Sequence, residues 1–199
     1  MKKVLYFHGF SSAGSTGTAV LLRNYLYRDN GVSVLSPDIP VMPDEALEFL
    51  TQYVQEEAPD LIIGTSMGAM FAELMKGIPR ICVNPSFHMA KLLTFKHLNK
   101  NVDFQNPRED GATSFKVDKA MVESFREIET TLSLKNITPE EKKRVWGIFG
   151  KHDPVVNCQS EFIKAYGKSQ FRLVDGEHSL TQTMLKHDVL PLILQILEK

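Results

Sequence analysis

The sequence has few cysteines, little net charge and no long hydrophobic run, and each absence excludes a class of protein. Among its 199 residues are two cysteines, Cys82 and Cys158, which lie far apart and in neither metal-binding nor redox spacing. Such a chain is not a scaffold held together by disulfides. We expect both thiols to be unpaired, which suits a reducing cytoplasm.

Charge and hydrophobicity exclude two kinds of partner. The 23 basic and 24 acidic residues leave a formal net charge of −1, which offers no footprint for nucleic acid or an anionic membrane. No segment approaches the roughly 20 apolar residues that span a bilayer. The apolar residues 4–7 stop at His8, short of the roughly 7–15 apolar residues in the core of a secretory signal. We expect a soluble, cytoplasmic protein that binds a small molecule; the sequence leaves its oligomeric state open.

Short apolar runs alternate with helical patterns along most of the chain, as in a parallel sheet built from βα units. The length and the hydrophobic content of 43% suit one domain with its own core. The expected fold class is α/β, with a mainly parallel sheet of about six strands flanked by helices. We expect strands at residues 4–7, 32–35, 61–63, 81–83, 145–149 and 171–174, and helices at 16–28 (capped by Ser15), 43–57, 66–76 and 181–199.

Residues 87–143 break this rhythm, because they contain no strong strand pattern. They hold a short helical piece over 89–98, a polar segment, and an amphipathic helix over 117–132. We expect a single domain over residues 1–199 with 87–143 as an inserted, cap-like helical excursion. Two interpretations stay open: a lid over the carboxyl ends of the strands, or a helix that covers the sheet as any crossover does.

A nucleophile motif follows the third expected strand. Gly64-Thr65-Ser66-Met67-Gly68 matches Gly-x-Ser-x-Gly, in which a tight strand-to-helix turn lifts the serine hydroxyl above the sheet. The helix N-terminus at this point favours developing negative charge. The alternative is a serine in a glycine-flanked turn without chemistry. The strand before the motif and the small residues after it favour Ser66 as a nucleophile.

A nucleophilic serine needs a base and an acid that orients the base, and in this architecture both follow later strands. Asp153 follows the fifth expected strand and His178 the sixth, so the chain order Ser66, Asp153, His178 is the expected one. Asp153 also suits a turn or helix cap before proline. Asp175 is a rival acid, and His152 is a candidate for lining the pocket rather than for the base.

Two backbone N–H groups complete the expected machinery. Oxyanion donors in this architecture come from the residue after the nucleophile, here Met67, and from the loop after the first strand, where we choose Phe10. Gly9 lets the backbone approach a substrate, and Phe10, Met67 and Phe87 are expected to contact it. We expect His8 to pack and form hydrogen bonds within its loop rather than to titrate. The chemistry requires no metal and no organic cofactor.

Taken together, these motifs resemble the small bacterial esterases of the YqiA/YcfP type in the α/β-hydrolase superfamily. The matching segments lie at residues 6–12, 64–68, 83–86, 150–156 and 176–179, whereas residues 87–144 show the least likeness. The resemblance implies a compact α/β-hydrolase fold and hydrolysis of carboxylic esters, with triad roles on Ser66, Asp153 and His178. Two rivals remain: an acyl thioesterase, and a non-catalytic ligand-binding or partner-binding module on a hydrolase scaffold.

Overall fold

A computed structural model gives the structure of the chain for residues 1–132 and 134–198, with the backbone alone described for residues 28–30. Its main sheet contains β1 (Lys3–Phe7), β2 (Ser33–Leu35), β3 (Leu61–Thr65), β4 (Arg80–Val83), β7 (Val145–Gly150) and β8 (Phe171–Val174). The strands lie in the order β2-β1-β3-β4-β7-β8, and every neighbouring pair is parallel. The expected parallel sheet of six strands is therefore confirmed.

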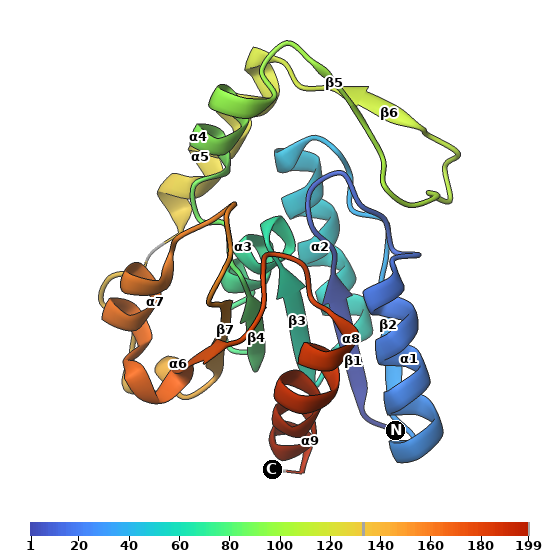
Figure 1. Cartoon of the computed structure of the whole chain (residues 1–199), viewed down its shortest axis with the longest axis vertical. Helices are drawn as coiled ribbons and strands as arrows, with labels where there is room; N and C mark the ends of the chain where they lie inside the picture. The colour runs from blue at the N-terminus through green and yellow to red at the C-terminus, as the bar shows by residue number, and fades with distance from the viewer. Residues whose placement is uncertain (133, 199) are drawn as a thin grey trace.

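Helices cover both faces of this sheet (Figure 1). One face packs against α1 (Gly17–Asn30) and the C-terminal segments α8 (Gln182–Met184), a π-helical turn (Leu185–Val189) and α9 (Leu190–Leu197). The other face packs against α2 (Pro43–Glu57), α3 (Met67–Leu74) and α7 (Gln159–Tyr166), which a short 3₁₀ turn (Lys168–Gln170) follows. No helix in the described part of the chain is long and apolar enough to cross a bilayer.

The structure corrects two expected helix ends. Thr16, not Ser15, caps α1: its hydroxyl accepts a hydrogen bond from the N–H of Ala19 at 3.2 Å, while the Ser15 hydroxyl donates to the carbonyl of Pro107. The expected continuous C-terminal helix is interrupted by the π-helical turn. Pro191 at the start of α9 lacks an N–H, and the wider turn before it makes room for the ring.

The insert between β4 and β7 contains α4 (Met89–Lys96), β5 (Asn101–Asp103), β6 (Ser114–Lys116), α5 (Lys119–Thr131) and α6 (Pro139–Lys142). Strands β5 and β6 form an antiparallel hairpin that the sequence did not predict. Figure 1 shows α4, α5 and the hairpin above the ends of the sheet strands, opposite both termini. Each hairpin strand has three residues, a partly buried apolar one between two exposed polar ones, so its alternation is too short to predict a strand.

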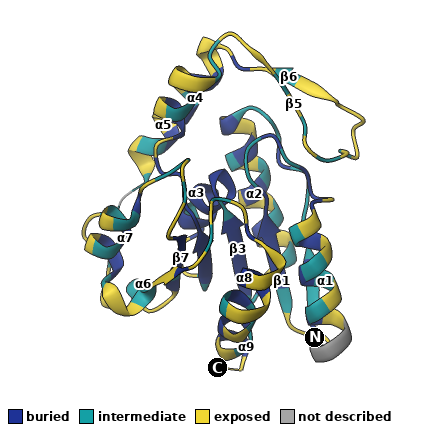
Figure 2. Cartoon of the chain, in the orientation of Figure 1, coloured by how far each residue is buried: buried dark blue, intermediate teal, exposed yellow. Residues whose placement is uncertain are grey.

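The helices of the insert share a core with the sheet. Four residues of α5 are buried with residues of β1, α2 and α3 in one cluster: Met121, Val122, Phe125 and Ile128. The rings of Phe71 and Phe125 lie 6.4 Å apart. Figure 2 shows the sheet as buried and the hairpin as largely exposed. The insert is thus anchored through α5, and its hairpin extends from that anchor.

Candidate active site

Ser66 lies at the turn between β3 and α3, with a backbone φ of 55° and ψ of −116°. A Cβ on Gly64 would lie 2.4 Å from the carbonyl oxygen of Gly68, and a Cβ on Gly68 would lie 2.1 Å from that of Phe7. Real Cβ atoms do not approach backbone this closely, so the turn requires glycine at both positions. The left-handed φ of Ser66 is strain of the kind that accumulates at functional sites.

The structure brings Ser66, His178 and Asp153 together although they come from three loops. The Nε2 atom of His178 lies 3.0 Å from Oγ of Ser66, and its Nδ1 atom lies 2.8 Å from Oδ2 of Asp153. A carboxylate can only accept, so the imidazole proton is on Nδ1 and Nε2 is free to accept the proton of Ser66. The arrangement can therefore deprotonate a serine hydroxyl.

Asp153 is held by its own loop. Its carboxylate is 3% exposed, and its second oxygen, Oδ1, accepts from the N–H groups of Val155 at 2.7 Å and Val156 at 3.2 Å. Asp153 therefore both closes a turn and contacts His178. These two backbone donors fix the orientation of the carboxylate, with Oδ2 directed toward His178.

Asn84 joins the loops that carry Asp153 and His178, a role that was not predicted from the sequence. It is fully buried, and its Oδ1 accepts from the N–H of Gly150 at 2.7 Å. Its Nδ2 donates to the carbonyls of Glu177 at 2.9 Å and His178 at 2.8 Å. The φ of Asn84 is 44°, a conformation that asparagine tolerates better than most residues. An asparagine directly after a buried strand, before proline, was the available signal.

Two backbone N–H groups near Ser66 are free to donate. Within residues 1–132 and 134–198, neither Phe10 nor Met67 uses its N–H in a hydrogen bond. Met67 is the first residue of α3, where helix N–H groups have no partner within the helix. A Cβ on Gly9 would be 3.6 Å from Cβ of Ser66, an ordinary contact, so glycine there leaves space beside the serine rather than avoiding a clash.

His8 lies beneath this loop as a packed, neutral residue. Its Nε2 accepts from the N–H of Ile39 at 3.0 Å, so the proton is on Nδ1, which donates to the carbonyl of Gly9 at 2.9 Å. Burial lowers the pKa of His8 to about 4. His8 therefore supports the shape of the loop that carries Phe10.

A cavity of about 610 Å³ opens over Ser66. Gly9, Phe10, Ser66 and His178 line it, and so do residues of the insert, including Gln105 from the hairpin. The hairpin is bonded to the loop after β1, since the N–H of Gln105 donates to the carbonyl of Ser11 at 2.8 Å and the amide of Asn106 donates to the hydroxyl of Ser12 at 3.1 Å.

Two expected contact residues lie elsewhere. Phe87 is 2% exposed and packs in a core cluster with Phe149 and Phe162, because the chain turns into the core after Pro85. It lines neither the cavity over Ser66 nor the pocket beside it. The side chain of Met67 is buried against the sheet, so only its backbone faces the serine turn.

His152, His88 and the two cysteines lie outside the group of Ser66, His178 and Asp153. His152 does not line the cavity: its Nε2 lies 3.1 Å from Oδ1 of Asp175, whose side chain is 93% exposed. Both cysteines are free and buried, and burial raises the pKa of each thiol. In the described part of the chain, one group has metal-ligand spacing, namely His88, Cys158 and Glu161.

Comparisons with known proteins agree with this architecture. The model of a family described as "Uncharacterised protein family (UPF0227)" matches residues 3–193. Est1E from Butyrivibrio proteoclasticus superposes with a TM-score of 0.68 at 18% identity, covering 100% of this chain and 89% of that one.

Two further solved structures are similar. The esterase domain of a Rhodothermus marinus protein has a TM-score of 0.59 at 15% identity, covering 92% of this chain and 80% of that one. The enol-lactonase from Burkholderia xenovorans LB400 has a TM-score of 0.58 at 10% identity, covering 100% of this chain and 92% of that one. At these identities the likeness establishes the fold, which is the expected α/β-hydrolase fold.

Proposed function

This chain belongs to the uncharacterised protein family UPF0227, as its resemblance to the YqiA/YcfP type implied, and we propose that it is a serine hydrolase that cleaves carboxylic esters of small acyl substrates. The observation that carries the proposal is the contact of Ser66 Oγ with His178 Nε2 at 3.0 Å, with Asp153 at 2.8 Å from the other ring nitrogen. The esterases among the similar structures support the choice of bond.

In the proposed mechanism, His178 takes the proton of Ser66 as the serine oxygen attacks the ester carbonyl. Asp153 holds the imidazole in the required tautomer and stabilises the imidazolium that forms. The protonated His178 then gives its proton to the leaving alcohol, and an acyl group remains on Ser66. Water, deprotonated by His178, releases the acid and restores the serine.

The negative charge on the carbonyl oxygen would be held by the N–H groups of Phe10 and Met67. Both are unengaged in the described structure, and Met67 adds the positive end of α3. Each oxyanion donor is worth about 3 kcal/mol of transition-state stabilisation. We further propose that residues 87–143 form the cap of this single domain, because α4 and the hairpin both contribute to the cavity wall.

The test is intact-mass analysis after exposure to a fluorophosphonate, with Ser66→Ala alongside. We expect one covalent adduct on the parent and none on the variant. Ser86→Ala is a matched control, since Ser86 is also buried and its N–H donates to the carbonyl of Ser66, and it should keep the adduct. A well-folded parent that forms no adduct would contradict the proposal and favour a binding module.

Turnover measurements then identify which bond the protein cleaves, an ester or a thioester. Matched acyl esters and thioesters of the same chain length are compared by kcat/KM, since the same machinery can cleave both. Faster cleavage of the ester supports the proposed activity, and a marked preference for the thioester would replace it with a thioesterase.

A further inference from the structure

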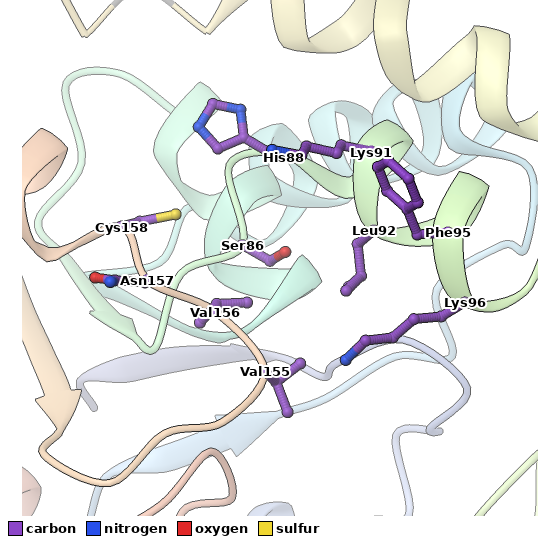
Figure 3. A pocket seen from close by; sticks show the side chains of 10 residues that line it. All are labelled: Ser86, His88, Lys91, Leu92, Phe95, Lys96, Val155, Val156, Asn157 and Cys158. Atoms are coloured by element: carbon purple, nitrogen blue, oxygen red, sulfur yellow. The ribbon is translucent and has the colours of Figure 1, made fainter.

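A second pocket of about 340 Å³ adjoins the cavity over Ser66. Leu92, Lys96 and Val155 line both, so the two spaces meet at these residues. Figure 3 shows this pocket between α4 above and the loops after β4 and β7 below, with Ser86 and Val156 at its base. A group bound at Ser66 can therefore extend into the second pocket beneath α4.

Helix α4 presents two rows of side chains to this pocket. Leu92 and Lys96 stand four residues apart, as do Lys91 and Phe95, and this spacing places each pair on one face of a helix. The Phe95 ring is 78% exposed, which is unusual for a large apolar side chain that lines a cavity. The pocket thus has both apolar and polar lining residues, and α4 contributes Leu92 and Phe95 together with two lysines.

The charge at both pockets has one sign. Among the described residues, no aspartate or glutamate lines either space, whereas Lys91 and Lys96 do. The carboxylate of Asp153 is 3% exposed and already engaged with His178. Glu161, which does not line the pocket, lies 2.9 Å from Nε2 of His88.

Lys96 is placed where the two spaces join. Figure 3 shows its ammonium group extended toward Val155, at the boundary with the cavity over Ser66. In the part of the chain that the structure describes, this ammonium has no ion pair or hydrogen bond. A chain of net charge −1 therefore presents an uncompensated cation in the wall of the cavity that contains its candidate nucleophile.

The direction of an ester in the site follows from the proton that His178 must give. The leaving alcohol has to lie against Nε2 of His178, and His178 lines the first cavity but not the second pocket. The acyl side of the ester is then the part that extends beneath α4. Where this acyl chain enters the pocket it would pass Leu92, and a carboxylate on the chain would meet the Lys96 ammonium at the junction of the two spaces.

We propose that the pocket beneath α4 binds the acyl part of the substrate, and that Lys96 selects acyl chains that carry a carboxylate. The inference rests on the proposed function and specifies its substrate class, namely esters of dicarboxylic acids in which one acid group is free. Lys91 adds positive charge to the wall of the same pocket, while Lys96 contacts the free carboxylate of the acyl chain.

The test compares two substrates that differ in one charge: mono-4-nitrophenyl adipate and its methyl ester. The parent should hydrolyse the anionic ester with the higher kcat/KM, mainly through a lower KM. Lys96→Met, which keeps the apolar stem, should lower kcat/KM for the anionic ester about five-fold, the size of effect for an exposed ion pair. The same substitution should change kcat/KM for the neutral ester by no more than about two-fold. Lys96→Glu should lower kcat/KM for the anionic ester further than Lys96→Met does.

Lys100→Met is the matched control. Lys100 is exposed and follows Lys96 by four residues, beyond the end of α4. Its ammonium donates to the carbonyl of Lys96, and it lines neither pocket. It should leave the preference unchanged. A parent without preference for the anionic ester would overturn the proposal. So would a Lys100→Met effect equal to that of Lys96→Met, or equal losses of kcat/KM on both substrates.

A third substrate tests the assignment of the acyl side. The ester 4-carboxyphenyl hexanoate has its carboxylate on the leaving group, so its hydrolysis should be insensitive to Lys96→Met. Sensitivity to that substitution would contradict the assignment.

Failure of the proposed function has a different signature. It would appear as no turnover of the neutral ester and no fluorophosphonate adduct on Ser66. In that case calorimetric binding of monomethyl adipate and dimethyl adipate decides the matter. Tighter binding of the anion that Lys96→Met abolishes supports the subsite, and equal binding of both molecules overturns it.

Discussion

Asn84 shows how much of the candidate site depends on a side chain that touches no reacting atom. Its amide bridges the N–H of Gly150 and the carbonyls of Glu177 and His178, so it fixes the spacing between two loops. Because misplacing a catalytic group by about 1 Å can cost about 10²-fold in rate, this spacing matters for turnover.

Replacing Asn84 by alanine should lower kcat by about 10- to 10²-fold with little change in KM, because the His178 loop loses its support. Asn99→Ala is the control: Asn99 is exposed and has a φ of 62°, so it carries a similar backbone cost without the three bonds. Steady-state kinetics well below the melting temperature of each variant are the measurement. Equal effects of the two substitutions would contradict a positioning role for Asn84.

Asp153→Asn should lower kcat by about 10⁴-fold while the fold is retained, because an amide no longer imposes the tautomer of His178 that accepts from Ser66. Asp175→Asn offers a matched control, since Asp175 pairs with the exposed His152. Turnover of an acyl ester and the far-UV circular dichroism of both variants are compared. Undiminished turnover in Asp153→Asn would remove this residue from the mechanism.

His8 should make stability fall as the solution becomes acidic. Its pKa is about 4 in the folded chain and near 6.5 in the unfolded chain, so below pH 6.5 the unfolded state binds the proton first. Stability is therefore full above pH 6.5 and decreases down to about pH 4, by about 3 kcal/mol for this group. Urea unfolding of the parent and His8→Asn at pH 7.5 and 4.5 measures it. A parent with the same pH dependence as the variant would contradict the assignment.

At the scale of elements, the turn between β3 and α3 is defined by contacts of backbone with backbone. Gly68→Ala should destabilise the chain by about 3 kcal/mol, since the new Cβ would press on the carbonyl of Phe7 and neither side can move away. Gly17→Ala has open space around its Cβ at the start of α1 and should be near neutral. Thermal denaturation of both variants measures this difference in stability. Similar melting temperatures would show that the turn can relax.

Elements with a strong local pattern could be predicted from the sequence, and the others could not. The α2 bounds match the prediction from Pro43 to Glu57, because proline and acids at the helix start agree with the tertiary structure. The β5–β6 hairpin has strands too short for a clear alternation, and it is held by bonds such as that of Gln105 to Ser11, which join distant segments. The role of Asn84 could not be predicted either, because its partners are backbone groups, which every sequence carries.

At the scale of the whole molecule, the insert and the sheet share one hydrophobic core. Phe125 of α5 is fully buried in the cluster that includes Phe7 of β1 and Phe71 of α3. Removing the insert would expose the apolar side chains of α2 and α3 that pack against α5. The chain should therefore unfold as one cooperative unit, although 87–143 looks like a separate piece in the sequence.

Calorimetry should show a single transition whose calorimetric and van't Hoff enthalpies agree. Phe125→Ala should lower the free energy of unfolding of the whole chain by about 3–5 kcal/mol, because it leaves a cavity in the shared core. Phe95→Ala is the matched control, since Phe95 is 78% exposed and should cost little. Two separate transitions, with only one shifted by Phe125→Ala, would show that the insert folds independently.

The base of the hairpin has a consequence for how proteins of this architecture can diverge. The N–H of Asn99 donates to the carbonyl of Val117 at 2.7 Å, and the N–H of Val117 donates to that of Lys100 at 2.9 Å, so the segment leaves and returns at one place. Chain can be added or removed between these residues without moving α4, α5 or the sheet. Because this segment also carries Gln105 into the cavity wall, we expect changes of length here to alter the shape of the cavity while Ser66, His178 and Asp153 keep their positions. If the chain is the hydrolase we propose, the hairpin is where substrate range can change separately from the chemistry.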